Sequence, residues 1–193
     1  MKQWILMGWM LVLGMSWAGG GLAADLNAGW LAYQSQDYGR AYKLWLPAAR
    51  KDSIVAQHNL GMMYLQGQGV QRDDTAAAFW FEKAATLGSA AAQTSLGALY
   101  MEGRGVQRDY FRAFELWYRA AKVGFAEAQY NLGQMYAQGI GVSRDYEKAV
   151  KWYRKAAQQG HLLAQASQED LLRQGLGLKR LPFPQNSMWS KFG

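Results

Sequence analysis

The spacing of apolar and small residues repeats along most of this chain with a period of 36 residues. In the stretch 126–161, alanine, leucine, glycine and tyrosine recur three or four positions apart, as on one face of a helix. The same frame returns at 90–125 and at 54–89. A fixed period in this range is typical of repeat proteins, in which each unit buries its apolar face against its neighbours. The pattern therefore predicts an all-α array of helix-turn-helix repeats.

The first helix of each repeat is expected to bury one stripe of apolar and small residues. The predicted first helices cover residues 54–66, 90–102 and 126–138, and the stripe of the first copy consists of Ala56, Leu60, Gly61 and Tyr64. A glycine inside a helix costs about 1 kcal/mol relative to alanine. Its return at Gly61, Gly97 and Gly133 predicts that a neighbouring backbone passes there too closely for a methyl group.

A glycine-rich loop follows each first helix, with the sequence Gly67-Gln68-Gly69-Val70 in the first copy. The first glycine is predicted to cap the helix in a left-handed conformation, the second to keep the turn open, and the valine to insert into the core. A phosphate-binding loop is disfavoured, because no strand precedes this segment and no Lys-Ser/Thr follows it. An aspartate, Asp73 in this copy, stands where the next helix needs an N-cap.

The second helices are predicted to start at Asp74, Tyr110 and Tyr146 and to end near Leu87, Val123 and Gln159. Their stripes alternate large aromatic residues with alanines, as in Trp80 and Phe81 between Ala77 and Ala84. This alternation favours interdigitated core packing over the alternative, an aromatic ladder that stacks on sugars.

The two ends of the array are predicted to be caps. Residues 25–53 form an abbreviated first repeat, in which Tyr33 corresponds to Tyr64 and five loop residues are missing; Pro47 falls inside its second helix. Residues 162–178 form a partial last repeat with polar residues on the face that lacks a neighbour. Residues 179–193 form a proline- and aromatic-containing tail. We favour its folding back on the last helix over its serving as a ligand for a partner.

Residues 1–24 have the pattern of a secretory signal peptide. Lys2 precedes an apolar run over residues 4–18, and small residues lead up to Asp25. Cleavage after Ala23 and cleavage after Ala24 fit equally well, and removal of Lys2 would lower the net charge from +7 to +6. An uncleaved membrane anchor is the less favoured alternative, because the apolar run is short for a membrane span. The leading prediction is a bacterial periplasmic or secreted protein with no membrane span after cleavage.

Composition argues against most kinds of chemical site. The chain has no cysteine, which excludes disulfides and thiolate chemistry, and its two histidines, His58 and His161, lie in different repeats. No glutamate stands at helical spacing from either histidine, and no nucleophile motif is present. We therefore predict no catalytic, cofactor or metal site, and a protein that is not an enzyme. The net charge of +7 favours anionic partners only mildly, and we predict no nucleic-acid partner.

These motifs resemble the Sel-1-like repeat family, a relative of the tetratricopeptide repeats. The residues that carry the resemblance include Ala128-Gln129-Tyr130-Asn131-Leu132-Gly133, Tyr136, Gly139-Ile140-Gly141-Val142, Trp152-Tyr153 and Ala156-Ala157. The resemblance implies a right-handed α/α superhelical solenoid that acts as a scaffold for protein–protein contact. It also implies roles of secreted members in envelope assembly, polysaccharide export, flagellar motor support or host interaction. The penicillin binding of one cysteine-rich subgroup is not carried over, because this chain has no cysteine.

The variable positions of the first helices are the predicted partner-binding groove. Solenoids of this kind stack their first helices along the concave side, so positions opposite the buried stripe would line one surface. The predicted groove residues are His58, Asn59, Met62, Thr94, Ser95, Tyr130, Asn131 and Gln134. They are mostly polar and adaptable, which suits a peptide or an extended chain. A merely solvated helix surface fits the same pattern equally well.

A second candidate surface consists of Arg72, Arg108 and Arg144, which precede the N-cap aspartates. It could bind an anionic glycan or a lipid headgroup, but we favour pairing of each arginine with a neighbouring acid or carbonyl. The sequence as a whole predicts a non-enzymatic scaffold or adaptor in the periplasm or cell envelope. The first alternative is a module that binds an envelope glycan, either an anionic polysaccharide or peptidoglycan, and a hydrolase is the second.

Overall fold

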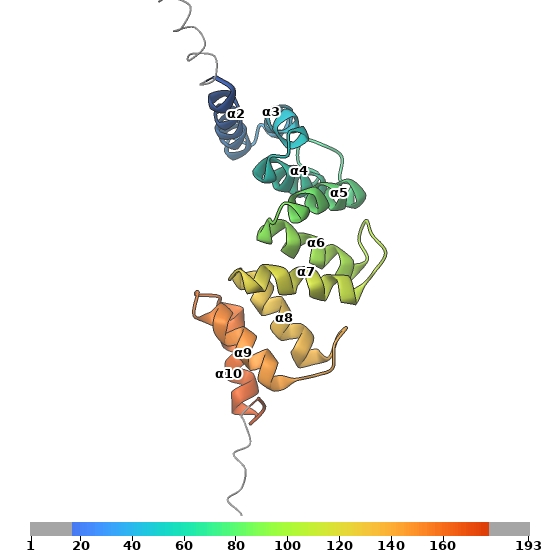
Figure 1. Cartoon of the computed structure of the whole chain (residues 1–193), viewed down its shortest axis with the longest axis vertical. Coiled ribbons are helices and arrows are strands. Elements are labelled where there is room, and N and C mark those ends of the chain that lie inside the picture. Colours follow the sequence, from blue (N-terminus) through green and yellow to red (C-terminus); the bar gives the residue numbers. More distant parts are fainter. Residues whose placement is uncertain (1–16, 178–193) are drawn as a thin grey trace, which may run out of the picture. The chain divides into compact units, whose positions relative to one another are not determined.

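The computed structural model describes residues 17–177, with side chains from Asp25 onward, and this part of the chain contains helices and turns but no strand. Its helices, labelled in Figure 1, are α2 (Trp17–Gln34), α3 (Tyr38–Arg50), α4 (Ile54–Gln66), α5 (Asp74–Thr86), α6 (Ala90–Glu102), α7 (Tyr110–Lys122), α8 (Ala126–Gln138), α9 (Tyr146–Ala157) and α10 (Leu162–Arg173). They belong to two compact units, Met1–Arg119 (unit 1) and Ala120–Gly193 (unit 2), so the division falls within α7.

The predicted helices agree closely with those of the structure. The first helices α4, α6 and α8 have the predicted bounds, and the second helices α5, α7 and α9 begin at the predicted residues. The second helices end at Thr86, Lys122 and Ala157, one or two residues before the predicted ends. Within each unit, helices that follow one another in the chain pack together. The all-α helix-turn-helix fold is therefore confirmed.

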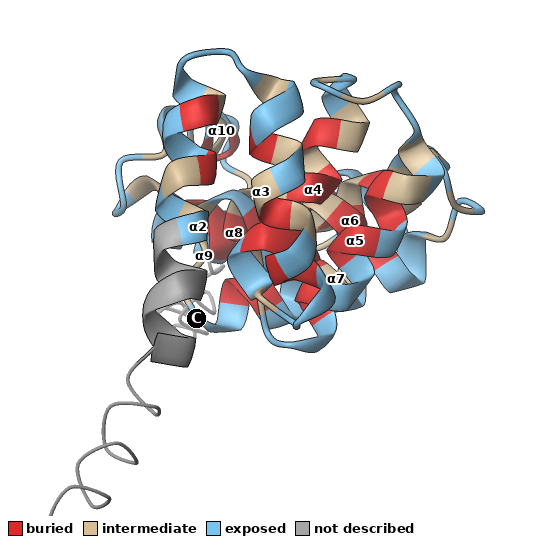
Figure 2. Ribbon diagram, turned by 90° about the horizontal axis from the view of Figure 1, so that it is seen from above, coloured by how far each residue is buried: buried red, intermediate tan, exposed pale blue. Residues whose placement is uncertain are grey.

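The core of each unit lies where consecutive helices meet, and Figure 2 shows the buried residues gathered on these faces. Ala56, Leu60, Phe81 and Ala84 have no exposed surface, as the stripes predict. The glycines inside the first helices are tightly packed, but against a ring and not against a backbone. A methyl group on Gly61 would lie 2.5 Å from the Phe81 ring, and one on Gly97 would lie 2.5 Å from the Trp117 indole. The prediction of a close backbone at these glycines was wrong.

The loop and cap predictions are confirmed in the first full repeat and recur in the next. Gly67 and Gly103 end their helices in the left-handed region, with φ of 70° and 72°. The Asp73 carboxylate accepts hydrogen bonds from the backbone N–H groups of Thr75 and Ala76, at 2.9 and 3.0 Å. The loop valines, Val70 and Val106, pack against the core as predicted.

The second glycine of each loop joins two repeats. A side chain on Gly105 would collide with the backbone of Asp74, the first residue of α5 in the preceding repeat, and Gly69 lies in the same way against Tyr38. Glycine is required here because of this close approach as well as the positive φ of 66° at Gly105. The loop of one repeat thus rests on the start of the second helix before it, which the expectation of an open turn did not include.

A glutamine that recurs in every full repeat forms a side-chain hydrogen bond across the turn between two repeats. The side-chain amide of Gln57 donates to the carbonyl of Ala49, that of Gln93 to Ala85, and that of Gln129 to Ala121, at 3.0 to 3.2 Å. These carbonyls lie near the ends of second helices, where backbone acceptors lack an intrahelical partner. The same carbonyls also accept from the backbone N–H groups of Asp52, Gly88 and Gly124. The buried glutamine therefore adds a second hydrogen bond that joins the end of one repeat to the next.

The abbreviated first repeat differs by one residue from its predicted register. The ring of Trp45 covers Gly29 as Phe81 covers Gly61, and Asp37 N–H donates to Ala32 as Asp73 N–H donates to Tyr64. Ala32, and not Tyr33, is therefore the equivalent of Tyr64, and four loop residues are missing instead of five. The predicted cleavage site after Ala23 or Ala24 lies within α2, which begins at Trp17. Pro47 lies inside α3, as predicted.

The partial last repeat keeps the repeat frame as far as Gly177. In unit 2, α10 packs on α9, and Gly177 lies against the carbonyl of Tyr146 as Gly105 lies against Asp74 in unit 1. The predicted tail, residues 179–193, lies outside the described residues, so both interpretations of it remain predictions.

Candidate functional site

In unit 1, the predicted groove residues lie on α4 and α6. His58, Asn59, Met62 and Ser95 are half-buried, so each keeps some surface open to a partner. The imidazole of His58 packs 5.6 Å from the Phe81 ring, and burial lowers the pKa of His58 below its usual value. His58 is therefore a neutral group at pH 7.

Thr94 belongs to the core of unit 1 more than to its surface. It is only 7 % exposed, and its hydroxyl donates to the carbonyl of Ala90 at 2.8 Å. Its own carbonyl accepts a hydrogen bond from the Trp117 indole at 3.0 Å. Of the predicted groove residues, Thr94 offers the least to a partner.

The same face of unit 1 carries two exposed apolar residues, and the sequence reasoning missed one of them, Trp30. Val55 on α4 is 57 % exposed and Trp30 on α2 is 50 % exposed. Trp30 follows Gly29 as Met62 follows Gly61, so it stands at the Met62 position of the first repeat. The one-residue error in register concealed it. This face of unit 1 therefore combines apolar side chains with a neutral histidine.

In unit 2, three predicted groove residues lie on α8, and two of them are bonded to each other. The side-chain amide of Gln134 donates to the hydroxyl of Tyr130 at 2.6 Å. The Tyr130 ring stacks on His161 at 4.7 Å and tilts against Tyr153 at 5.7 Å. Asn131 beside them is half-buried. Tyr130 is thus held in one orientation, with its hydroxyl proton left to donate to a ligand.

His161 links this cluster to an acid. Its Nδ1 accepts the N-cap hydrogen bond from Ala164 N–H at 3.2 Å, so the neutral ring carries its proton on Nε2. That nitrogen lies 3.0 Å from the Glu127 carboxylate and donates to it. The search for histidine–glutamate pairs at helical spacing could not find this contact, because it joins neighbouring repeats 34 residues apart.

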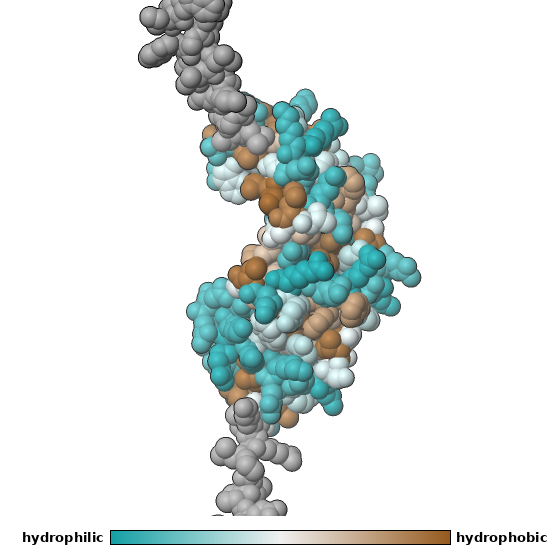
Figure 3. All heavy atoms as spheres, in the orientation of Figure 1, coloured by the Kyte–Doolittle hydropathy of each residue, from teal (hydrophilic) through white to brown (hydrophobic). Residues whose placement is uncertain are grey.

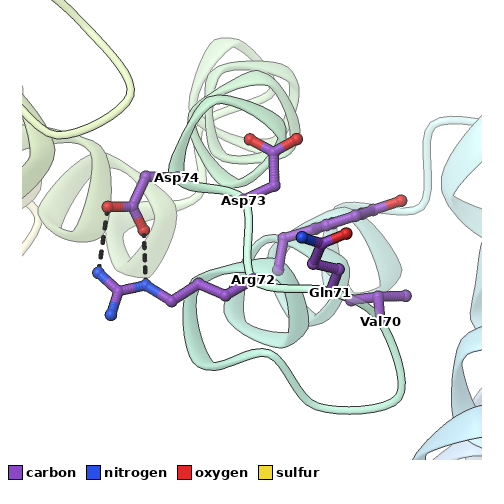
Figure 4. Close-up of a pocket in the computed structure, with 6 residues that line it drawn as sticks. Val70, Gln71, Arg72, Asp73 and Asp74 are labelled. Carbon is purple, nitrogen blue, oxygen red and sulfur yellow. Dashed lines mark hydrogen bonds and ion pairs between the residues drawn. The ribbon is translucent and has the colours of Figure 1, made fainter.

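Each arginine of the second candidate surface contacts a nearby side chain, but only Arg72 has the acidic partner that the favoured interpretation predicts. Arg72 binds Asp74 with two hydrogen bonds of 3.3 Å, which Figure 4 shows. Arg108 lies 5.6 Å from the Tyr110 ring and Arg144 lies 5.5 Å from the Tyr146 ring. Each contacts the residue two positions further along the chain, so these guanidinium groups have partners without a glycan.

An arginine–aspartate contact that joins two repeats was also missed by the sequence reasoning. Arg104, between the two loop glycines, binds Asp74 of the preceding repeat at 2.9 and 3.1 Å. Hydrogen bonds from Arg104 and then from Arg72 hold the pKa of Asp74 at about 2. Position 104 is Gln68 in one neighbouring repeat and Ile140 in the other, so its variability hid it.

Open pockets recur beside the loops of unit 1. One of about 790 Å³ is lined by Tyr64 and by residues 70–74, and one of about 440 Å³ is lined by the equivalent Tyr100 and loop residues 106–109, with Arg112. Their polar groups already bind one another. Tyr64 bonds to Tyr42 at 2.9 Å, which together with burial raises the pKa of Tyr64 to about 12, and Arg112 donates to Tyr100 at 2.8 Å. These pockets are therefore gaps between satisfied loops.

The described residues show no metal-binding cluster of three or more histidine, aspartate or glutamate side chains. Within residues 17–177, none of the helices combines the length and the apolar character needed to span a membrane.

The family model described as "Sel1 repeat" matches residues 22–53, 54–89, 90–125 and 126–161, which make up most of the chain. This chain belongs to the Sel1 repeat family. The first match begins at residue 22, three residues before the predicted cap, and the next three coincide with the predicted repeats. Sel1 repeat proteins are generally scaffolds for protein–protein interaction, which agrees with the partner type predicted here.

Solved structures support the same fold. A protective antigen of uropathogenic Escherichia coli with an SLR fold matches 84 % of this Sel1 chain, with 34 % identity and a TM-score of 0.80. A Sel1 repeat protein from Oxalobacter formigenes matches 80 %, with 31 % identity and a TM-score of 0.75. The chain covers 36 % and 62 % of those two proteins. Cysteine-rich protein B of Helicobacter pylori, at 22 % identity and a TM-score of 0.54, shares the fold. A search of curated proteins found no match.

Proposed function

We propose that this Sel1 repeat protein is a non-enzymatic scaffold that holds a segment of a protein partner on its first helices, in the periplasm or cell envelope. The proposal rests on how the variable side chains of these helices are packed. Their variable residues are half-buried and oriented by packing, as His58 and Tyr130 are, yet retain polar atoms for a ligand. Side chains held in this way lose little conformational entropy on binding.

The two units offer different contacts to such a segment. Trp30, Val55 and Met62 of unit 1 would take apolar side chains, whereas Tyr130 and Glu127 of unit 2 would take polar ones or a backbone. The engaged arginines give the glycan alternative less support than the protein scaffold. The secretory pattern of residues 1–24 supports the periplasmic address.

The partner surface can be tested by crosslinking capture from periplasmic extract. The wild type is compared with Asn59→Ala/Tyr130→Ala/Asn131→Ala and with a control on the second helices, Lys43→Ala/Glu82→Ala/Lys122→Ala. We expect the first variant to lose partners that the wild type and the control both capture. Identical partners for all three proteins would refute the assignment to the first helices.

The proposed periplasmic location is tested separately, by fractionation of cells that express the full chain and by N-terminal sequencing. We expect periplasmic protein that begins at Ala24 or Asp25. Protein that remains in the cytoplasm with Met1 or Lys2 at its start would contradict the proposed location.

A further inference from the structure

A pocket of about 580 Å³ lies in unit 2 between α9 and the residues that end the partial last repeat. Three of its lining residues, Lys148, Lys151 and Arg154, follow one another at intervals of three on α9, so they share one side of that helix. We call this pocket, with these three cations, the basic pocket. Figure 3 shows hydrophilic atoms over α9, whose position Figure 1 labels.

The cations of the basic pocket exceed the acids that face them. Lys148 pairs with the N-cap residue Asp145 at 3.1 Å. That leaves Lys151 and Arg154 against a single lining carboxylate, Glu147. Within the described residues, neither Lys151 nor Arg154 forms an ion pair. The arrangement is the reverse of the Asp74 site in unit 1, where one carboxylate receives two arginines.

The sequence that follows the pocket residues is also rich in positive charge. Gly177 lines the pocket, and the chain continues with Leu178, Lys179 and Arg180. The remaining tail adds Lys191 and contains no aspartate or glutamate. A side-chain carboxylate for the pocket would therefore have to come from a partner and not from residues 178–193.

The pocket also has an apolar floor. Val150 is 3 % exposed and Leu172 is half-buried, and both line the cavity. An occupant that satisfies the whole pocket needs a carboxylate for the cations and an aliphatic group for the floor. A peptide carries both groups within two residues. A polysaccharide usually binds by stacking on aromatic rings, whereas the described side chains that line this pocket are charged or aliphatic.

We propose that the basic pocket binds an acidic segment of a protein partner, with a carboxylate between Lys151 and Arg154 and an aliphatic side chain on Val150 and Leu172. This surface lies on a second helix and is separate from the first-helix site. It rests on the proposed scaffold function only in requiring that the partner be a protein.

The test measures fluorescence anisotropy of a short fluorescein-labelled peptide of alternating glutamate and leucine, titrated with the purified full chain. We expect Lys151→Ala/Arg154→Ala to weaken binding about tenfold or more, since it removes both unpaired cations. The matched control is Arg40→Ala/Lys43→Ala, which removes the same charge from α3, at the positions that correspond to Lys148 and Lys151. The control should bind as the wild type does, and thermal melts should show all three proteins folded.

Three results would overturn the proposal. Equal binding of a glutamine–leucine peptide would show that charge does not select the ligand. An equal loss in the α3 control would show that net charge acts and not the pocket. Displacement of the peptide by polygalacturonate as effectively as by unlabelled peptide would assign the site to an anionic polysaccharide. The first-helix triple variant should keep full affinity for the probe, so failure here is distinguishable from failure of the first-helix site.

Discussion

The first-helix faces of the two units occupy the same positions of the repeat and differ in chemistry. In unit 1, Trp30 and Val55 expose apolar surface beside a neutral His58. In unit 2, Tyr130 is stacked and hydrogen-bonded, and the Glu127 carboxylate accepts a hydrogen bond from His161. The packing beneath them is the same in both units, with a ring over a helical glycine and a glutamine bonded to a carbonyl. The constant residues build the scaffold, and the variable ones differentiate its faces.

The largest expected loss of stability comes from replacing the helical glycine that packs against an aromatic ring. Gly97→Leu in unit 1 and Gly133→Leu in unit 2 would force leucine into the Trp117 and Tyr153 rings. We expect each to lower the free energy of unfolding by about 3 kcal/mol, through overpacking of the core. Urea denaturation measures this. The control is Gly39→Leu on α3, where nothing lies within 4 Å, and it should be neutral or stabilising.

Removing the glutamine hydrogen bond should also affect both units alike. Gln129→Leu and Gln93→Leu leave the carbonyls of Ala121 and Ala85 without these donors. We expect each to cost about 1 kcal/mol, the net contribution of one hydrogen bond, because the N–H groups of Gly124 and Gly88 still bond to these carbonyls. The exposed Gln66→Leu serves as control, with a change within about 0.5 kcal/mol. Loss in only one unit would show that the packing beneath the two faces is not equivalent.

His161 tests the difference between the faces. His161→Ala removes the N-cap of α10 and should cost about 1 kcal/mol. His161→Ser should recover most of that loss, because Ser53 and Ser89 cap the equivalent helices with their hydroxyls. Both variants lose the contacts with Glu127 and Tyr130. If serine were no more stable than alanine, the main role of His161 would lie in those contacts and not in the cap.

The smallest expected effect is the loss of folding stability at low pH when Asp74 is protonated. The pKa of Asp74 is held at about 2 in the folded chain and is near its usual value, about 3.9, in the unfolded chain. The resulting stabilisation is present above about pH 4 and is lost as the pH falls towards about 2. Because the site is at the surface, we expect less than about 1 kcal/mol. Urea melts of wild type and Asp74→Asn across this range should converge at the acid end. A constant difference would contradict the ion-pair explanation.

Much of the scaffold was predictable because its interactions are local or repeated. The helix bounds, the left-handed Gly67 and the Asp73 cap depend on neighbours a few residues away. The candidate sites were harder to predict. The Glu127–His161 and Arg104–Asp74 contacts join side chains 34 and 30 residues apart, and their residue types do not recur in the other repeats. A pattern built on recurrence discards such positions.

The sequence by itself determined the period, the two helices of each repeat, their caps and the family, because these depend on spacing along the chain. Only the tertiary structure decided what lies against each residue. It placed a ring, and not a backbone, over Gly97, shifted the register of the first repeat to Ala32, and moved Thr94 into the core. Within residues 17–177, it left Lys151 and Arg154 without an ion pair while giving Asp74 two arginines. The reason is that charge pairing and side-chain burial depend on distances between repeats, which spacing along one repeat does not encode.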